Sequence, residues 1–125
     1  MAESMRRSNR KPSGGRFVVE RKKRKKELAR FPAMTKVDEN KKAKVIRVAG
    51  GNQKRVLLSD NQINVMTKEG KAAKTTIKNV VENTANPNLV RRNILTKGAI
   101  VETDLGKVKI TSRPGHDGCL NGVQI

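Results

Sequence analysis

The chemistry that this sequence could carry is concentrated in closely spaced cations. Six lysines and arginines follow one another from Arg21 to Lys26, and further cations stand on both sides of this run. A guanidinium presents a planar fork of donors that matches the oxygens of a phosphate, and each phosphate that is neutralised releases condensed counterions. The pattern therefore predicts contact with RNA or DNA. A solvated tail or a nuclear-import-like signal is the alternative interpretation.

The predicted phosphate-binding residues fall into two sets. The first set lies in the amino-terminal segment and comprises Arg6, Arg7, Arg10, Lys11, Arg16, Arg21, Lys22, Lys23, Arg24, Lys25, Lys26 and Arg30. Gly14 and Gly15 join it because a backbone without Cβ can pass close to a sugar–phosphate strand. The second set comprises Arg91, Arg92, Lys97 and Arg113. For each member of the second set alone, an exposed solubilising charge explains the residue equally well.

Residues that could support catalysis or hold a metal are few. His116 is the only histidine and Cys119 the only cysteine, which is two ligands short of a structural zinc site. The stretch at residues 50–52 lacks the lysine–serine pair of a P-loop, so we interpret it as a hairpin turn. A further turn is expected at Pro114 and Gly115, and His116 and Asp117 lie in it, before Gly118. These two residues could act as an acid–base pair, but the turn could simply expose an imidazole to water or RNA. We expect no enzymatic activity, no metal, no cofactor and no small-molecule substrate.

The charge of the whole chain points to the same class of partner. Its 29 Lys and Arg against 11 Asp and Glu give a formal net charge of +18 over 125 residues. Residues 1–30 hold 12 cations and 3 glutamates, and the rest of the chain holds 17 cations and 8 acidic residues, so each part carries +9. Such a charge repels itself unless a polyanion neutralises it. The sequence therefore predicts a basic arm joined to a milder domain.

Three further features indicate the cellular compartment and the kind of partner. No stretch approaches the roughly 20 apolar residues that span a bilayer, and the basic run lacks an apolar face that could anchor it on a membrane surface. A single cysteine allows no intrachain disulfide, which fits a reducing intracellular compartment. Two phenylalanines, with no Tyr or Trp, provide no platform for stacking bases. We therefore expect a cytoplasmic protein that recognises phosphates and shape and has no membrane partner.

Short apolar stretches separated by turn residues predict β-structure in most of the chain. Gly50, Gly51 and Asn52 tolerate positive φ and indicate a hairpin. Asn86 and Pro87 predict a single helical turn, through Arg92, with Asn as its cap and Pro at its first position. In residues 107–113, apolar and polar residues alternate as in a half-buried strand. Strands are expected at residues 43–49, 53–59, 62–67, 74–81, 99–103, 107–113 and 120–125.

These elements predict a mainly β protein with two parts. Residues 41–125 are expected to form a small antiparallel β-barrel of about six strands, since closure removes exposed strand edges. Residues 1–40 are expected to form a long basic, largely irregular extension. Neighbouring like charges disfavour compact structure in water, so this extension alone should be disordered. We expect it to gain order from negative charges outside the protein.

Several stretches, spread over nearly the whole length, form an ordered set. They are RKPSGG at residues 10–15, RKKRKKEL at residues 21–28, GGN at residues 50–52 followed by Lys54 and Arg55, VEN at residues 81–83, RRNILTKGA at residues 91–99 and TSRPG at residues 111–115. This set resembles the S-eight-e family of small-subunit ribosomal proteins, whose pattern has Thr at the position of Ser13 and Gly at that of Ala29. The short length is similar to the archaeal form. The resemblance adds Lys54 and Arg55 to the predicted RNA-binding residues.

The resemblance implies a structural constituent of the small ribosomal subunit, with a role in translation and subunit assembly. Its partners would be small-subunit ribosomal RNA, bound by the basic extension and by a basic face of the barrel, and neighbouring ribosomal proteins. From the residues alone, a non-ribosomal nucleic-acid-binding protein, such as an RNA chaperone or DNA compactor, is the main alternative. An RNA-modifying enzyme and an adaptor that binds acidic proteins through its tail are the others.

Overall fold

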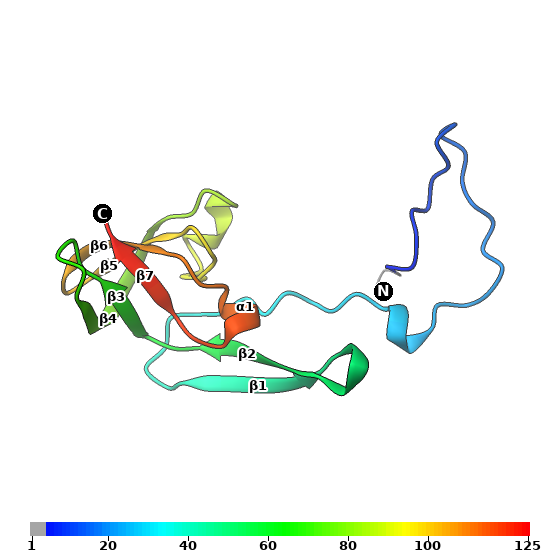
Figure 1. Ribbon diagram of the computed structural model, residues 1–125. Coiled ribbons are helices and arrows are strands. Elements are labelled where there is room, and N and C mark those ends of the chain that lie inside the picture. The colour runs from blue at the N-terminus through cyan, green and yellow to red at the C-terminus, as the bar shows by residue number, and fades with distance from the viewer. Residues whose placement is uncertain (1–4) are drawn as a thin grey trace. The chain divides into compact units, whose positions relative to one another are not determined.

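The computed structural model describes residues 5–125. It divides the chain into two compact units, Met1–Pro32 and Ala33–Ile125. The first unit contains one short 3-10 helix, η1 (Lys25–Glu27). The second contains the strands and turns in Figure 1, which are β1 (Lys42–Arg47), η2 (Ala49–Gly51), β2 (Gln53–Ser59), β3 (Gln62–Met66), β4 (Ala72–Glu82), η3 (Pro87–Leu89), β5 (Ile100–Thr103), β6 (Gly106–Ile110), α1 (Pro114–Asp117) and β7 (Asn121–Gln124).

Five strands, β3 to β7, form a closed barrel in which each strand pairs with the next along the chain. The mainly β class and the closed barrel predicted from sequence are confirmed, but the expectation of about six strands, all antiparallel, is wrong. The four sequential pairs are antiparallel, and β7 closes the ring by pairing with β3 in parallel. An odd number of strands that alternate in direction must bring two parallel neighbours together when the ring closes. The parallel pair is therefore a consequence of the strand number.

The first two strands do not belong to the barrel. β1 and β2 pair only with each other, as a separate two-stranded antiparallel sheet. The sequence predicted this hairpin and its turn correctly, since Gly50 and Gly51 have φ of 73° and 75°. It wrongly placed both strands in the barrel wall. β1 is exposed along most of its length, because a strand with three cations and two large apolar residues cannot be covered on both faces.

The core of the second unit is built from aliphatic residues of the barrel and of the connections that cover it. Its members are Leu57, Ile63, Val65, Ile77, Val80, Leu95, Ala99, Val101, Val108, Ile110 and Leu120. The alternation predicted in β6 is confirmed, since Val108 and Ile110 are buried whereas Lys107 and Lys109 are exposed. The observed ends of some strands differ from the predicted ones. β4 is longer than expected, and β6 stops at Ile110 because the next two N–H groups donate to the Asn121 carbonyl, at 2.9 and 3.4 Å.

The helical turns have simple local causes. Asn86 Oδ1 accepts a hydrogen bond from the Asn88 N–H at 2.9 Å and Pro87 occupies the first position of η3, so the predicted cap is confirmed. The turn ends at Leu89, earlier than Arg92. The turn expected at Pro114 is the single α-helical turn α1. It ends at Asp117, and Gly118 follows as its cap with φ of 70°, a conformation that glycine adopts without strain.

The segment before β1 is tied to the body of the second unit. Thr35 is 2% exposed, its hydroxyl donates to the Leu57 carbonyl at 2.7 Å, and its own carbonyl accepts from the Leu95 N–H at 2.8 Å. Lys36 forms bridges to Ser59 on one side and Ile94 on the other. This segment therefore fills the space between the end of β2 and the connection that precedes β5.

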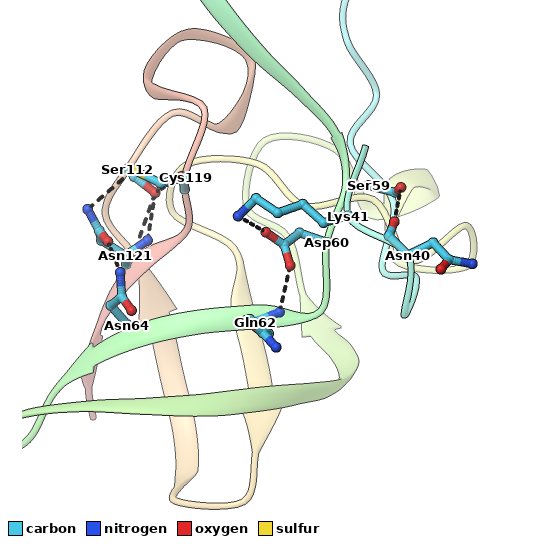
Figure 2. A network of polar contacts seen from close by, with 9 residues as sticks. All are labelled: Asn40, Lys41, Ser59, Asp60, Gln62, Asn64, Ser112, Cys119 and Asn121. Atoms are coloured by element: carbon cyan, nitrogen blue, oxygen red, sulfur yellow. Dashed lines mark hydrogen bonds and ion pairs between the residues drawn. The ribbon is translucent and has the colours of Figure 1, made fainter. Parts of the chain in front are cut away.

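A polar network fixes the base of the hairpin on the barrel (Figure 2). Asp60, which is 2% exposed, follows β2. Its Oδ2 lies 2.6 Å from Lys41 Nζ, and its Oδ1 accepts from the Gln62 N–H at 3.0 Å. The Ser59 hydroxyl donates to the Asn40 carbonyl at 2.7 Å. Residues on both sides of the hairpin are thus connected to the start of β3.

Candidate nucleic-acid interface

The first unit contains a tight turn at the predicted glycine pair. The Lys11 N–H donates to the Gly15 carbonyl at 2.7 Å, and the Gly14 N–H donates to the Lys11 carbonyl at 3.0 Å. Arg10 and Arg16 form a β-bridge on either side of this turn. Gly14 has φ of 85°, and an added Cβ there would meet nothing within 4 Å. The turn therefore needs glycine at this position for its backbone conformation, and the space beside Gly14 is open.

Phe17 organises two of the predicted cations. The guanidinium carbon of Arg7 lies 4.5 Å from the centre of its ring, and Lys11 Nζ lies 5.8 Å away. Both distances fall within the range of cation–π attraction. An additional hydrogen bond joins Arg7 Nη2 to the Val18 carbonyl at 3.4 Å. Phe17 therefore holds the Arg7 and Lys11 side chains against its ring.

Arg21 has an intramolecular partner. Its guanidinium forms a fork with the Glu27 carboxylate, with Nη1 donating to Oε2 at 3.2 Å and Nη2 to Oε1. These hydrogen bonds hold the pKa of the Glu27 carboxyl below its ordinary value. The Glu27 carbonyl also accepts from the Met5 N–H at 2.8 Å. Arg21 thus closes a loop within the basic segment, whereas Lys22, Arg24, Lys25 and Lys26 are exposed.

In the second unit, one group of predicted cations lies in the connection between β4 and β5. Val90 packs against the core, and Ile94 is buried. Between them, Arg91 and Arg92 are exposed. Lys97 is exposed further along, and the connection is braced by a hydrogen bond from Asn83 Nδ2 to Thr96 Oγ1 at 2.9 Å. Anchoring on both sides therefore presents the two arginines outward.

Another group of predicted cations lies around α1, which packs on β2. Arg55, on β2, lays its aliphatic stem over Gly118, so that a Cβ added to Gly118 would stand 2.9 Å from Arg55 Cγ. Arg113 is the residue immediately before α1. The fold thus brings Arg55 and Arg113 to opposite ends of one helical turn. Lys54, the neighbour of Arg55, is half-buried.

The neighbouring pair His116 and Asp117 has a structural explanation. Asp117 Oδ2 accepts from the Arg113 N–H at 2.8 Å, and Oδ1 lies 3.0 Å from His116 Nδ1. The first contact and then the second lower the pKa of the Asp117 carboxyl. The carboxylate therefore closes the turn of α1. Within residues 5–125, no cluster of three or more His, Cys, Asp or Glu side chains is arranged to hold a metal ion.

Three exposed cations of β1 were not among the residues predicted from sequence. Lys42, Lys44 and Arg47 belong to the hairpin that stands outside the barrel. The available signal was the absence of any acidic residue from Lys42 to Ser59, in a stretch with five cations. Because both strands were assigned to the barrel wall, one of their faces was expected to be buried. None of the helices in the described part of the chain is long and apolar enough to cross a membrane.

Comparisons with known proteins match the chain over its length. The family model described as ribosomal protein S8e matches residues 4–125. A small ribosomal subunit protein eS8 from Methanobrevibacter smithii is 55% identical over 126 residues, with 100% of each chain covered. Proteins of the same name from Nanoarchaeum equitans and Staphylothermus marinus are 54% and 53% identical, and the matches cover 95% and 91% of this chain and 94% and 90% of theirs.

Proposed function

The chain belongs to the ribosomal protein S8e family, and from this premise we propose that it binds small-subunit ribosomal RNA through its basic amino-terminal segment and a basic face of its β-domain. As a member of this family it is a ribosomal protein of the small subunit and not an enzyme. Its place is the ribosome, which we expect to lie in the cytoplasm. Neighbouring small-subunit proteins would be its other partners.

The observation that carries the RNA-binding proposal is the density of cations in the first unit. Residues 5–32 contain 12 Lys and Arg and two glutamates, and one of these glutamates, Glu27, is paired with Arg21. Phosphates are the abundant anions of a ribosome, and each one contacted releases counterions. Binding of residues 1–32 along RNA would bring together helices whose phosphates repel each other. The β-domain would fix the point from which this segment starts.

A second area of contact with RNA is supported by four arginines of the β-domain, which are Arg55, Arg113, Arg91 and Arg92. The first two flank α1, and the last two project from an anchored connection. Arginines on rigid turns lose little side-chain freedom when they bind a phosphate, compared with those of a flexible tail. We propose that these residues set the position of the β-domain on the RNA, while the amino-terminal segment supplies most of the affinity.

Fractionation of native lysate on sucrose gradients, with detection of this chain, tests the proposal. At low salt the chain should travel with small subunits, and high salt should release it because the contacts are mainly with phosphates. Treatment with nuclease should also release it, whereas a complex with acidic proteins would survive. A chain that remains at the top of the gradient at low salt, or that spreads over unrelated nucleic acids, would contradict a ribosomal role and favour an RNA chaperone or DNA compactor.

A further inference from the structure

The β1–β2 hairpin stands outside the barrel, and its first strand is exposed along most of its length. It pairs with no barrel strand, and Figure 1 shows its turn at the end remote from the barrel. Along Lys42–Ser59 it carries five cations and no acidic residue. Val45 is 59% exposed in the middle of β1. Two-stranded hairpins have marginal stability in water. We therefore expect a binding partner to stabilise the half of the hairpin that is remote from the barrel.

The register of the hairpin places cations on both of its faces. Residues directly opposite each other in an antiparallel pair point to the same side. Lys44 stands opposite Val56, and Ile46 opposite Lys54, so the two lysines share one face. Val45 stands opposite Arg55, and Arg47 opposite Gln53, so the two arginines share the other. A ribbon that rested on a single anionic surface would need cations on one face only.

The turn of the hairpin is narrow. Ala49, Gly50, Gly51 and Asn52 form it, and three of these four residues have a methyl group or no side chain. The Asn52 side chain folds back, donating from Nδ2 to the Ala49 carbonyl at 3.2 Å. A Cβ added to Gly51 would meet nothing within 4 Å. The leading end of the ribbon is therefore slim enough to enter a space between two strands of RNA.

We propose that the β1–β2 hairpin inserts between two phosphate backbones of the small-subunit RNA, with Lys44 facing one backbone and Arg47 facing the other. The inference rests on the proposed function and adds a binding element and its mode of binding. RNA fits better than an acidic protein surface, because phosphates repel one another and two backbones come close only where cations are placed between them. The hairpin supplies such cations on both sides.

The test measures binding of the full-length protein to deproteinised small-subunit RNA over a range of salt concentrations. Lys44→Gln and Arg47→Gln each remove one charge, from opposite faces. Each should lower the slope of log K against log salt by about 0.7 to 0.9, and the double variant by about twice that amount. Arg47→Lys keeps the charge and should retain the slope. Lys68→Gln, in the exposed turn between β3 and β4, is the matched control and should leave the slope closer to that of the wild type.

The outcomes separate this inference from the proposed function. Failure of the wild type to bind the RNA would refute both. Tight binding by the wild type with unchanged slopes for both variants would refute the hairpin alone. A change for one face only would also refute insertion between two backbones. If the variants bind deproteinised RNA normally but are lost from intact subunits, the hairpin contacts a protein, and the inference is wrong.

A second measurement reports the location directly. Asn52→Cys, in a Cys119→Ser background, places a single thiol at the hairpin turn for an iron chelate that cleaves nearby RNA. In reconstituted subunits we expect cuts in two separate RNA strands. Glu69→Cys in the same background, at the turn between β3 and β4, provides the comparison. Cuts confined to one strand, or the same pattern from both positions, would overturn insertion between two backbones.

Discussion

At Gly122, in β7, the barrel wall has no room for a side chain. A Cβ added there would lie 2.5 Å from Val108 Cγ1, 3.0 Å from the Lys109 carbonyl oxygen and 3.1 Å from Ile63 Cδ1. Gly122 pairs with Ile110 on β6 and with Val65 on β3, so it lies at the strand that closes the ring. In a barrel of only five strands the interior is narrow, and one glycine lets the last strand approach both neighbours.

Gly122→Ala should therefore lower the free energy of unfolding by roughly 1 to 3 kcal/mol, the usual cost of overpacking a filled core. Urea unfolding followed by circular dichroism measures it. Val108→Ala removes the nearest methyl group, so the double variant should be more stable than the sum of the two single changes allows. Strict additivity would show that the close approach to Val108 does not cause the loss.

Among the elements, the turn between β5 and β6 is tied to β4 by one carboxylate. Asp104 accepts a hydrogen bond from the Thr76 hydroxyl at 2.5 Å, and its other oxygen lies 3.0 Å from Lys78 Nζ. The hydroxyl and then the lysine hold the pKa of Asp104 below its ordinary value. The contact joins a turn to a strand that is distant in sequence, and so it supports the pairing of β4 with β5.

A carboxyl whose pKa is lowered by folding stabilises the protein above its unfolded pKa, and this contribution is lost as the pH falls through the folded value. Asp104→Asn should therefore be less stable than the wild type at pH 7, and the difference should shrink as the pH drops below about 4. Urea unfolding at neutral and acid pH gives both values. Glu102→Gln, from the same hairpin, controls for the change in net charge. An equal gap at both pH values would contradict the role of this carboxylate.

In the whole molecule, the two units differ in charge and in core packing, and we assign RNA binding and folding to different units. Met1–Pro32 and Ala33–Ile125 are distinct units, and the first carries most of its charge on exposed side chains. The second has a core of its own, made of aliphatic residues. We therefore expect the affinity for RNA to depend on the first unit and the folding of the β-domain to depend on the second.

Removal of residues 1–30 should abolish tight binding to small-subunit RNA at moderate salt and reduce the salt slope by several units, since each lost phosphate contact removes about 0.7 to 0.9. The circular dichroism of the β-domain should persist. Filter binding over a series of salt concentrations checks the first expectation, and thermal unfolding checks the second. Binding as tight as that of the full-length protein would mean that the amino-terminal segment is not the anchor.

The sequence by itself determined the class of the protein and most of its local structure. Alternation of apolar and polar residues located the strands, because side chains of a strand point to opposite faces with a period of two. Gly50, Gly51 and the Asn86–Pro87 pair located turns, because their conformational preferences act within a few residues. The cations predicted a polyanionic partner, and the ordered set of motifs indicated the family. The placement of individual cations on RNA remains a prediction.

Only the tertiary structure decided which strands pair and which stand apart. Strand partners are distant in sequence, and the one signal within β1 and β2, five cations without an acidic residue, does not by itself exclude these strands from the barrel wall. The parallel contact of β3 with β7 arises from the closure of five strands, and it depends on the small volume of Gly122 between Val108 and Ile63. The same closure leaves the hairpin outside the barrel. The period of two already places Lys44 and Arg47 on opposite faces of β1. The structure adds that the hairpin is a separate sheet, and its register shows which cations of β1 and β2 share a face.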